Sequence, residues 1–314
     1  MPPPSRALLG ACLALACASA TVAAAHVVHT PDDVSEPEPA YTAEHWGLVD
    51  FVPVPPFFID THDPVTQDVY ISGSVHAGTE PWDPYVWERI VALSRGVPKG
   101  SRFVDVGANL GYFSLAAASL GYSVVSFEPM SRNARKLARS VARNGFKDRV
   151  ALYQNAVGDI HGQRVALRET DAHNQGNGQL TDELPAPGGV YGVDYVETVT
   201  LSGTLLFSQL ESIDAHIALV LGPASAGSVL LGAREWICAR SVRHVLIEFS
   251  EATRSSLLFP AAEMFGFMQR AGYTVSDVSV GTEALMDYGP LVAGNFDGVP
   301  PNLLFSLRDS SSTC

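Results

Sequence analysis

A glycine-containing turn lies in the segment FVDVGANLGYFSLAA, residues 103–117, between an apolar run and the apolar start of a helix. Gly107 and Gly111 lack side chains, so the backbone between them can approach a ligand closely. The amino end of the next helix would face that ligand with free N–H groups. The dinucleotide-binding pattern is G-x-G-x-x-G, whereas this turn is shorter and has Asn109 at its centre. The turn alone therefore predicts a nucleotide or nucleoside without identifying it.

Two other polar residues follow apolar runs at positions that suit a nucleoside. Glu128 ends SVVSFE, 23 residues after Asp105, where a carboxylate can accept from both hydroxyls of a ribose. The alternative is a strand-end carboxylate in water. Asn155 follows RVALYQ, and its amide could contact the edge of an adenine, although alone it would be an ordinary turn residue. Together these residues favour a nucleoside without a pyrophosphate.

The elements that must position these residues alternate between short apolar strands and helices. Such alternation predicts an α/β fold with a doubly wound, mostly parallel sheet, in which ligands bind beyond the carboxyl ends of the strands. The predicted strands are 102–106, 122–128, 149–154, 217–222, 243–249, 273–280 and 302–309. The predicted helices are 82–96, 112–121, 131–145, 228–241 and 261–272. Residues 161–204 are predicted to be an insertion with two strands, GQRVALRET and YVETVTL.

The motifs DVGANLGYFSLAAA, FEP, QNAVGD, VLLGARE and VLIEFS, in this order and spacing, resemble the FkbM family of S-adenosylmethionine-dependent methyltransferases. The resemblance covers roughly residues 82–308. It implies a Rossmann-like class I methyltransferase sheet of seven strands with the last strand antiparallel. It also implies O-methylation of a hydroxyl on a sugar or small molecule. The cofactor residues that it implies are Asp105, Gly107, Ala108, Asn109 and Gly111 near the amino acid portion, Glu128 at the ribose, and Asn155 and Ala156 at the adenine.

The chain departs from the family pattern on the side where the methyl acceptor should lie. The family usually carries acidic residues in the segment that corresponds to Leu219–Ala226, and here every one of those positions is apolar or small. The usual Leu-Asp-Asp is Leu201-Ser202-Gly203. Because acceptor positioning and deprotonation depend on such groups, a binding module without catalysis is an alternative to an active enzyme. A nicotinamide-dependent oxidoreductase on the same fold is a third reading.

Few residues could replace the missing acids. Glu248 ends the strand HVLIE at the expected binding edge and is the candidate catalytic residue, although a strand-end glutamate is often only solvated. His173 and His216 could act as bases, although surface histidines are commoner than catalytic ones.

The amino-terminal residues predict a targeting segment. Residues 1–25 combine one positive charge, an uncharged Ala-rich run and small-x-small cleavage sites, which indicates a signal peptide and the secretory pathway. An uncleaved anchor in the Golgi or endoplasmic reticulum membrane, or targeting to another organelle, is the alternative. Cleavage would leave Cys238 and Cys314, which could form one disulfide in an oxidising compartment.

Residues 26–81 form an acidic, Pro-rich extension before a domain at 82–314. Residues 26–88 hold 12 acidic side chains and no Lys or Arg, and the rest of the chain is nearly neutral, which excludes the basic surface of a nucleic-acid binder. We expect the extension to pack through Phe51, Phe57 and Phe58. Its scattered histidines predict surface residues rather than a metal site. The basic helix at 131–145 predicts a solvated amphipathic helix that could also meet the acidic extension.

Overall fold

The structure is a computed structural model, and it describes most of the chain beyond the predicted signal. The described residues are 27–34, 45–95, 101–169, 173–174, 178–181, 193–203, 215–220, 226–239, 242–249, 254, 260–278 and 284–308. The predicted targeting segment lies outside them. Cys238 is disulfide-bonded, but Cys314 lies outside the described residues, so that pairing stays a prediction. Among the described helices, none has the length and apolar character needed to cross a bilayer.

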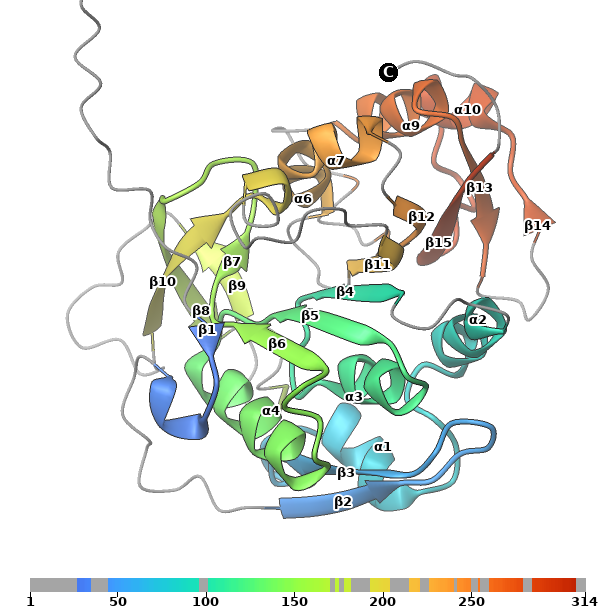
Figure 1. Cartoon of the computed structure of the whole chain (residues 1–314). Coiled ribbons are helices and arrows are strands. Elements are labelled where there is room, and N and C mark those ends of the chain that lie inside the picture. Colours follow the sequence, from blue (N-terminus) through green and yellow to red (C-terminus); the bar gives the residue numbers. More distant parts are fainter. Residues whose placement is uncertain are drawn as a thin grey trace, which may run out of the picture.

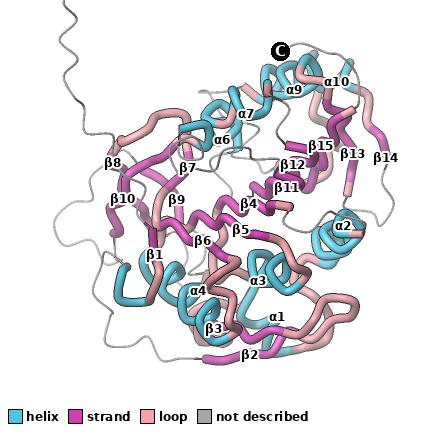
Figure 2. Tube along the Cα trace, viewed as in Figure 1, coloured by secondary structure: helices cyan, strands magenta, loops and turns pink. Residues whose placement is uncertain are grey.

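A nine-stranded sheet runs through the centre of the molecule in the order β1-β6-β5-β4-β11-β12-β15-β13-β14 (Figures 1 and 2). Neighbours among β6, β5, β4, β11 and β12 are parallel, whereas β15 is antiparallel to both β12 and β13. The strands are β1 Val27–Val28, β4 Arg102–Val106, β5 Ser123–Phe127, β6 Val150–Tyr153, β11 Ala215–Val220, β12 Val242–Glu248, β13 Tyr273–Asp277, β14 Ala284–Leu285 and β15 Asn302–Leu307.

This arrangement confirms the α/β, Rossmann-like fold and the antiparallel last strand, with one correction. Within the described residues the sheet has nine strands where seven were expected. The additional strands, β1 and β14, have two residues each and pair with the outer strands β6 and β13. Strands this short carry too little periodicity to be found in a sequence. They cover part of the sheet edges, which would otherwise expose unpaired backbone groups.

Helices cover both faces of the sheet (Figure 1). One apolar core gathers α2, α3 and α4 with the amino-terminal extension, and a second gathers α6, α7, α9 and α10 on the opposite face. The predicted helix at 228–241 is two shorter helices. The helices are α1 Ile71–Ala77, α2 Pro84–Ser94, α3 Tyr112–Ser119, α4 Ser131–Arg143, α6 Ala226–Gly232, α7 Arg234–Cys238, α9 Ala261–Arg270 and α10 Tyr288–Val292, and the 3₁₀ helix η1 is Pro31–Asp33.

The insertion between β6 and β11 forms a second, four-stranded sheet in the order β7-β10-β8-β9. Its strands are β7 Ala156–Val157, β8 Arg164–Glu169, β9 Gly178–Thr181 and β10 Val193–Val199. Both predicted strands are present as β8 and β10. Strand β9 was not predicted, because it follows a Gly- and Asn-rich stretch whose composition is typical of a loop.

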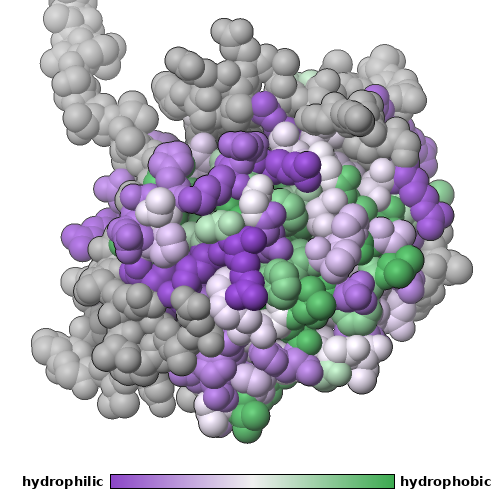
Figure 3. Space-filling model, turned by 60° about the horizontal axis from the view of Figure 1, so that its bottom comes forward, coloured by the Kyte–Doolittle hydropathy of each residue, from purple (hydrophilic) through white to green (hydrophobic). Residues whose placement is uncertain are grey.

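The amino-terminal extension packs beneath α3 and α4. Strands β2 His45–Val49 and β3 Phe57–Thr61 form an antiparallel hairpin, and β3 lies along α4. Phe57 is fully buried and Phe51 packs on the same core, as predicted, whereas Phe58 is exposed. Figure 3 turns this side of the molecule forward and shows apolar residues among hydrophilic ones. The extension is therefore part of the folded body, and the boundary at residue 82 stays a prediction.

Candidate nucleoside site

The turn after β4 adopts the left-handed backbone that its residues predict. Gly107, Asn109 and Gly111 have φ values of 81°, 53° and 86°. The N–H groups of Gly107 and Ala108 both donate to the carbonyl of Phe127, at 2.9 and 3.0 Å. Glycine adopts this conformation without steric cost, and Asn is among the few other residues that do so readily. The turn is thus bonded directly to the end of the neighbouring strand β5.

Gly111 is required for the packing of α3 against α4, and its contact with a cofactor stays a prediction. A Cβ at this position would overlap the side chain of Leu137 in α4. Together with its positive φ, this contact leaves no room for a larger residue. Gly111 therefore lets the start of α3 pack closely against α4.

The Asp105 carboxylate lies beneath α3, and its predicted place around the ligand stays a prediction. It is 1% exposed and accepts a 2.5 Å hydrogen bond from Ser114 Oγ, which also contacts Ser126 Oγ at 2.7 Å. Burial raises the pKa of Asp105 to about 6, opposed by the bonds from Ser114. Its contacts fix α3 against β4 and β5, and so position the turn.

Glu128 lies one residue beyond β5 and is bonded to the turn. Its Oε2 accepts from the Asn109 N–H at 2.7 Å, and its Oε1 accepts from the Met130 N–H at 2.9 Å. The residue is 3% exposed, and burial raises its pKa to about 7. The solvated strand-end alternative is therefore wrong. The carboxylate and the glycine turn form one unit, as a nucleoside site requires.

One acceptor in this unit is open. Asn109 Oδ1 is buried and has no hydrogen-bond partner in the described protein. A buried acceptor without a donor costs stability unless a ligand or water supplies one. A carboxylate also offers about four acceptor positions. Since two backbone donors reach Glu128, the carboxylate keeps acceptor positions for a ligand. The turn thus fits a ligand that carries hydroxyl or amino donors, as the nucleoside and amino acid parts of S-adenosylmethionine do.

Asn155 and Ala156 join the two sheets. Asn155 Nδ2 donates to the Glu197 carbonyl of β10 at 3.0 Å, and Asn155 is 2% exposed. Ala156 belongs to β7, which pairs with β10. This hydrogen bond of Asn155 to β10 was not predicted from the sequence. The contact of Asn155 with an adenine stays a prediction.

The acceptor-side candidates lie in different places. Glu248 is the last residue of β12, at the predicted edge, where it pairs with Asn302. His216 lies near the amino end of β11, whereas the turn follows the carboxyl end of the parallel strand β4, and its role as a base stays a prediction. His173 is exposed, and its carbonyl accepts from Val69 of the extension.

The positions where the FkbM resemblance would place acidic residues are described only in part. Leu201 is 1% exposed within the apolar core, and Ala226, at the start of α6, is also buried. Residues 221–225 lie outside the described residues.

His62 is a neighbour of the site that the sequence analysis missed. It is 2% exposed, so the predicted surface location is wrong for this histidine. Its Nε2 lies 2.7 Å from Asn133 Oδ1, and Asn133 Nδ2 donates to Sδ of Met130, whose own N–H donates to Glu128. The one signal in the sequence was the two-residue spacing of Asp60 and His62 in FFIDTH. Such a pattern predicts that these polar groups share one side of a strand.

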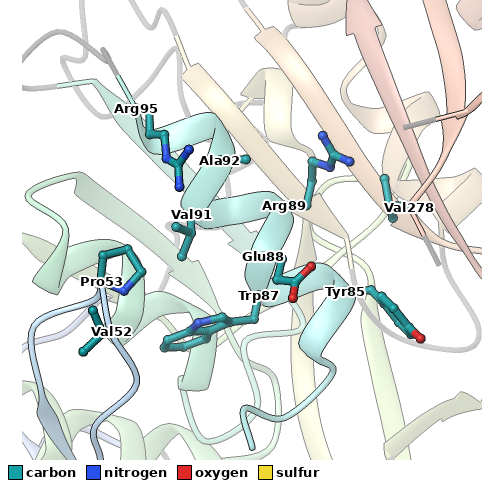
Figure 4. A pocket seen from close by; sticks show the side chains of 10 residues that line it. All are labelled: Val52, Pro53, Tyr85, Trp87, Glu88, Arg89, Val91, Ala92, Arg95 and Val278. Atoms are coloured by element: carbon teal, nitrogen blue, oxygen red, sulfur yellow. The ribbon is translucent and has the colours of Figure 1, made fainter. Parts of the chain in front are cut away.

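A separate hollow of about 390 Å³ lies beside α2 (Figure 4). It is lined by Val52, Pro53, Tyr85, Trp87, Glu88, Arg89, Val91, Ala92, Arg95 and Val278. None of the predicted site residues lines it. Within the described ranges, no three His, Cys, Asp or Glu side chains gather closely enough to hold a metal ion.

Comparisons with known proteins give similar folds but no family. No protein-family model and no curated protein matches the chain. A Streptococcus agalactiae protein of the NADB-Rossmann superfamily is 11% identical over 72% of this chain and 70% of its own, with a TM-score of 0.36. The N-terminal domain of human METTL16, solved in complex with SAH, is 11% identical over 72% and 71%, with a TM-score of 0.37.

A third similar structure is a precorrin-6y C5,15-methyltransferase from Geobacter metallireducens. It is 11% identical over 70% of this chain and 87% of its own, with a TM-score of 0.34. At such low scores and identities, the fold assignment rests on the strand order of this chain itself. That order differs from the dinucleotide-binding order 3-2-1-4-5-6 because an antiparallel strand lies between β12 and β13.

Proposed function

We propose that the protein binds S-adenosylmethionine and is a methyltransferase of the FkbM type that acts on a hydroxyl of a sugar or small molecule. One observation carries the proposal: the Glu128 carboxylate is buried, bonded to the backbone of the Asn109 turn, and retains acceptor capacity beside the open Asn109 Oδ1. This combination supports recognition of a ribose and an amino group. The antiparallel strand β15 is consistent with the sheet that the FkbM resemblance implies.

In this proposal the chain mainly binds and orients. Glu128 would accept from the ribose, and Asn109 Oδ1 would accept from a donor on the amino acid portion. When bound, the cofactor would supply an electrophilic methyl carbon on a sulfonium, to which an acceptor oxygen would bond in line as the carbon–sulfur bond breaks and S-adenosylhomocysteine leaves. Because such a displacement depends on alignment, a rigid turn is the main contribution of these residues. Glu248, at the same edge of the sheet, is the proposed base for the acceptor hydroxyl.

A binding module without catalysis is the second candidate. Two features favour it: the acceptor-side segment 219–226 contains no acidic residue, and Leu201 is buried in the core rather than presented at the edge. Both candidates require S-adenosylmethionine binding, and they differ in whether a methyl group leaves the cofactor. For either candidate we propose the secretory pathway, because of residues 1–25. Sequencing the amino terminus of the secreted protein would test whether cleavage occurs.

Calorimetric titration of the purified protein with S-adenosylmethionine, and separately with NAD, tests the proposal. We expect saturable binding of S-adenosylmethionine and none of NAD. Glu128→Ala should weaken the binding by roughly tenfold or more, because hydrogen bonds to a charged group are lost. Absence of binding, or a preference for NAD, would refute both candidates. If the cofactor binds, release of S-adenosylhomocysteine in the presence of glycan extracts, lost on Glu248→Gln, separates the enzyme from the binding module.

A further inference from the structure

The chain that enters α2 contacts two elements at one edge of the sheet. The Trp82 N–H donates to Tyr112 Oη at 3.1 Å, and Tyr112 is the first residue of α3, directly after the glycine turn. Asp83 Oδ2 accepts from Asn302 Nδ2 at 3.1 Å, and Asn302 is the first residue of β15. Trp82 and Asp83 therefore connect the start of α3 with the start of β15.

This edge carries the carboxyl ends of the parallel strands. Helix α3 follows the carboxyl end of β4, and β15 is antiparallel to β12, so that Asn302 pairs with Glu248, the last residue of β12. Strands β11 and β12 lie between β4 and β15. Because neighbouring strands are about 4.8 Å apart, the ends of β4 and β15 are separated by roughly 14 Å. Trp82 and Asp83 thus border the edge between the glycine turn and Glu248.

The side chains of Glu248 and Asn302 project to the face of the sheet on which α2 lies. Residues directly opposite each other in an antiparallel pair share a face, with Cβ atoms about 4.5–5.5 Å apart. Leu246 and Leu304, two residues along each strand, belong to the core that contains α2 and α3. Because side chains alternate along a strand, Glu248 and Asn302 face the same side as these leucines. Asn302 therefore neighbours two carboxyl groups, those of Asp83 and Glu248.

The Asp83 carboxylate has acceptor capacity beyond its helix cap. Its Oδ1 accepts from the Val86 N–H at 3.2 Å, which an Asn or Ser side chain at this position could do as well. A carboxylate offers about four acceptor positions. Two side-chain or backbone donors reach it, from Val86 and Asn302, so it keeps positions for a ligand. Asp83 is only partly buried, so these positions are not closed off by the core.

An aromatic surface lies beside Asp83. Trp82 is half-buried, Tyr70 is 45% exposed, and their ring centroids are 6.2 Å apart. Sugar hydroxyls donate to carboxylates, and the apolar face of a sugar ring can pack on an aromatic side chain. This combination favours a sugar over an acceptor that carries a single hydroxyl on an apolar body.

We propose that Asp83 is a specificity-determining residue for a sugar acceptor, and that it binds the hydroxyl next to the one that is methylated. This inference rests on the proposed function. The methylated oxygen bonds to the methyl carbon as the carbon–sulfur bond breaks, and its proton passes to Glu248. Asp83 accepts from the neighbouring hydroxyl and is not consumed, so it selects acceptors with two adjacent hydroxyls. Asp83 thereby supplies a carboxylate to an edge where segment 219–226 has none.

The test measures the binding of sugars by NMR titration in the presence of saturating S-adenosylhomocysteine. The probes are the methyl glycosides of glucose, galactose, mannose and xylose, each compared with its monodeoxy analogues. We expect the wild-type protein to bind at least one glycoside. Removal of one hydroxyl should weaken that binding by roughly tenfold or more, because a hydrogen bond to a charged group is lost.

Asp83→Asn removes the charge with little change in shape. Asn keeps the helix cap and readily adopts the φ of 42° found at this position. The variant should bind the parent glycoside roughly tenfold more weakly, and removal of the same hydroxyl should then change its affinity by about twofold or less. Its affinity for S-adenosylhomocysteine should stay within about twofold of the wild type. Asp83→Ser, a second variant that can cap the helix, should behave in the same way.

The matched control is Asp287→Asn. Asp287 caps α10 by accepting from the Gly289 N–H at 3.0 Å, and its substitution should leave the binding of both ligands unchanged. If Asp83→Asn remains as sensitive to the hydroxyl as the wild type, Asp83 is only a helix cap and the inference is wrong. If S-adenosylhomocysteine binds but no glycoside does, or if choline binds in their place, the sugar assignment is wrong. If S-adenosylhomocysteine itself does not bind, the proposed function fails.

Discussion

Substitution of Asp60 by Asn tests whether the extension stabilises the domain. Asp60 is fully buried and contacts Lys136 Nζ at 3.0 Å and Arg139 Nε at 2.6 Å. The Lys136 side chain is 1% exposed, so removal of the carboxylate charge leaves an ammonium group buried beside a neutral amide. Breaking a buried ion pair on one side typically costs about 3–5 kcal/mol. Arg139, at 12% exposed, can partly turn to water, which favours the lower part of that range.

The assay is equilibrium unfolding in urea at neutral pH, followed by tryptophan fluorescence and circular dichroism. We expect Asp60→Asn to lower the free energy of unfolding by about 3 kcal/mol, a large part of the stability of a typical domain. Asp50→Asn, at an exposed position directly after β2, the strand that pairs with β3 of Asp60, is the matched control and should change it by about 0.5 kcal/mol or less.

A double substitution separates charge from shape. Asp60→Leu combined with Lys136→Met replaces the ion pair with apolar groups, which is often neutral or stabilising in a buried site. It should recover at least half of the loss. If Asp60→Asn lowers the free energy of unfolding by less than about 1 kcal/mol, this prediction is wrong, because a buried Lys136 without its counter-charge should destabilise the protein by more.

Three further predictions concern packing, titration and surface contacts. Gly111→Ala should destabilise the protein by about 2–4 kcal/mol in thermal unfolding, from the positive φ and the overlap with Leu137, and an added Leu137→Ala should restore part of the loss. The buried Glu128 carboxyl has a raised pKa, so its contribution to stability is present in acid and lost as pH rises through about 7. The free energy of unfolding of Glu128→Gln minus that of the wild type should therefore increase by about 3 kcal/mol between pH 4.5 and 8. A difference that does not change with pH would contradict the burial of this group. Arg143→Ala, which removes a guanidinium 4.3 Å from each of two aromatic rings of the extension, should cost about 1 kcal/mol by urea unfolding, and no change would show that these contacts do not stabilise the protein.

Local signals predicted much of the fold. The Asp-Pro pair at 83–84 indicated a helix start, and Asp83 does cap α2 through the Val86 N–H. Glu128 was found because strand length fixes its offset from the glycine turn, and the two meet through a 2.7 Å hydrogen bond. Such features depend on residues close in sequence or on the spacing of neighbouring parallel strands.

The errors concern contacts between distant segments. Helix α4 was predicted to be solvated on its basic face, but Lys136 is buried because Asp60, 76 residues earlier, supplies its counter-charge. His62 was assigned to the surface for the same reason, since its partner Asn133 is 71 residues away. The expectation that the basic helix meets the extension was correct. One buried carboxylate, rather than the general acidity of the extension, dominates this interface. Periodicity within one segment cannot show such pairings.

The most direct test of the central claim is a crystal structure of the protein with S-adenosylhomocysteine. The account predicts that the ligand lies beyond the carboxyl end of β4, with a ribose hydroxyl in hydrogen-bond distance of the Glu128 carboxylate and a donor on Asn109 Oδ1. A ligand bound elsewhere, such as in the hollow beside α2, would contradict it. So would a ligand at the turn whose ribose does not contact Glu128.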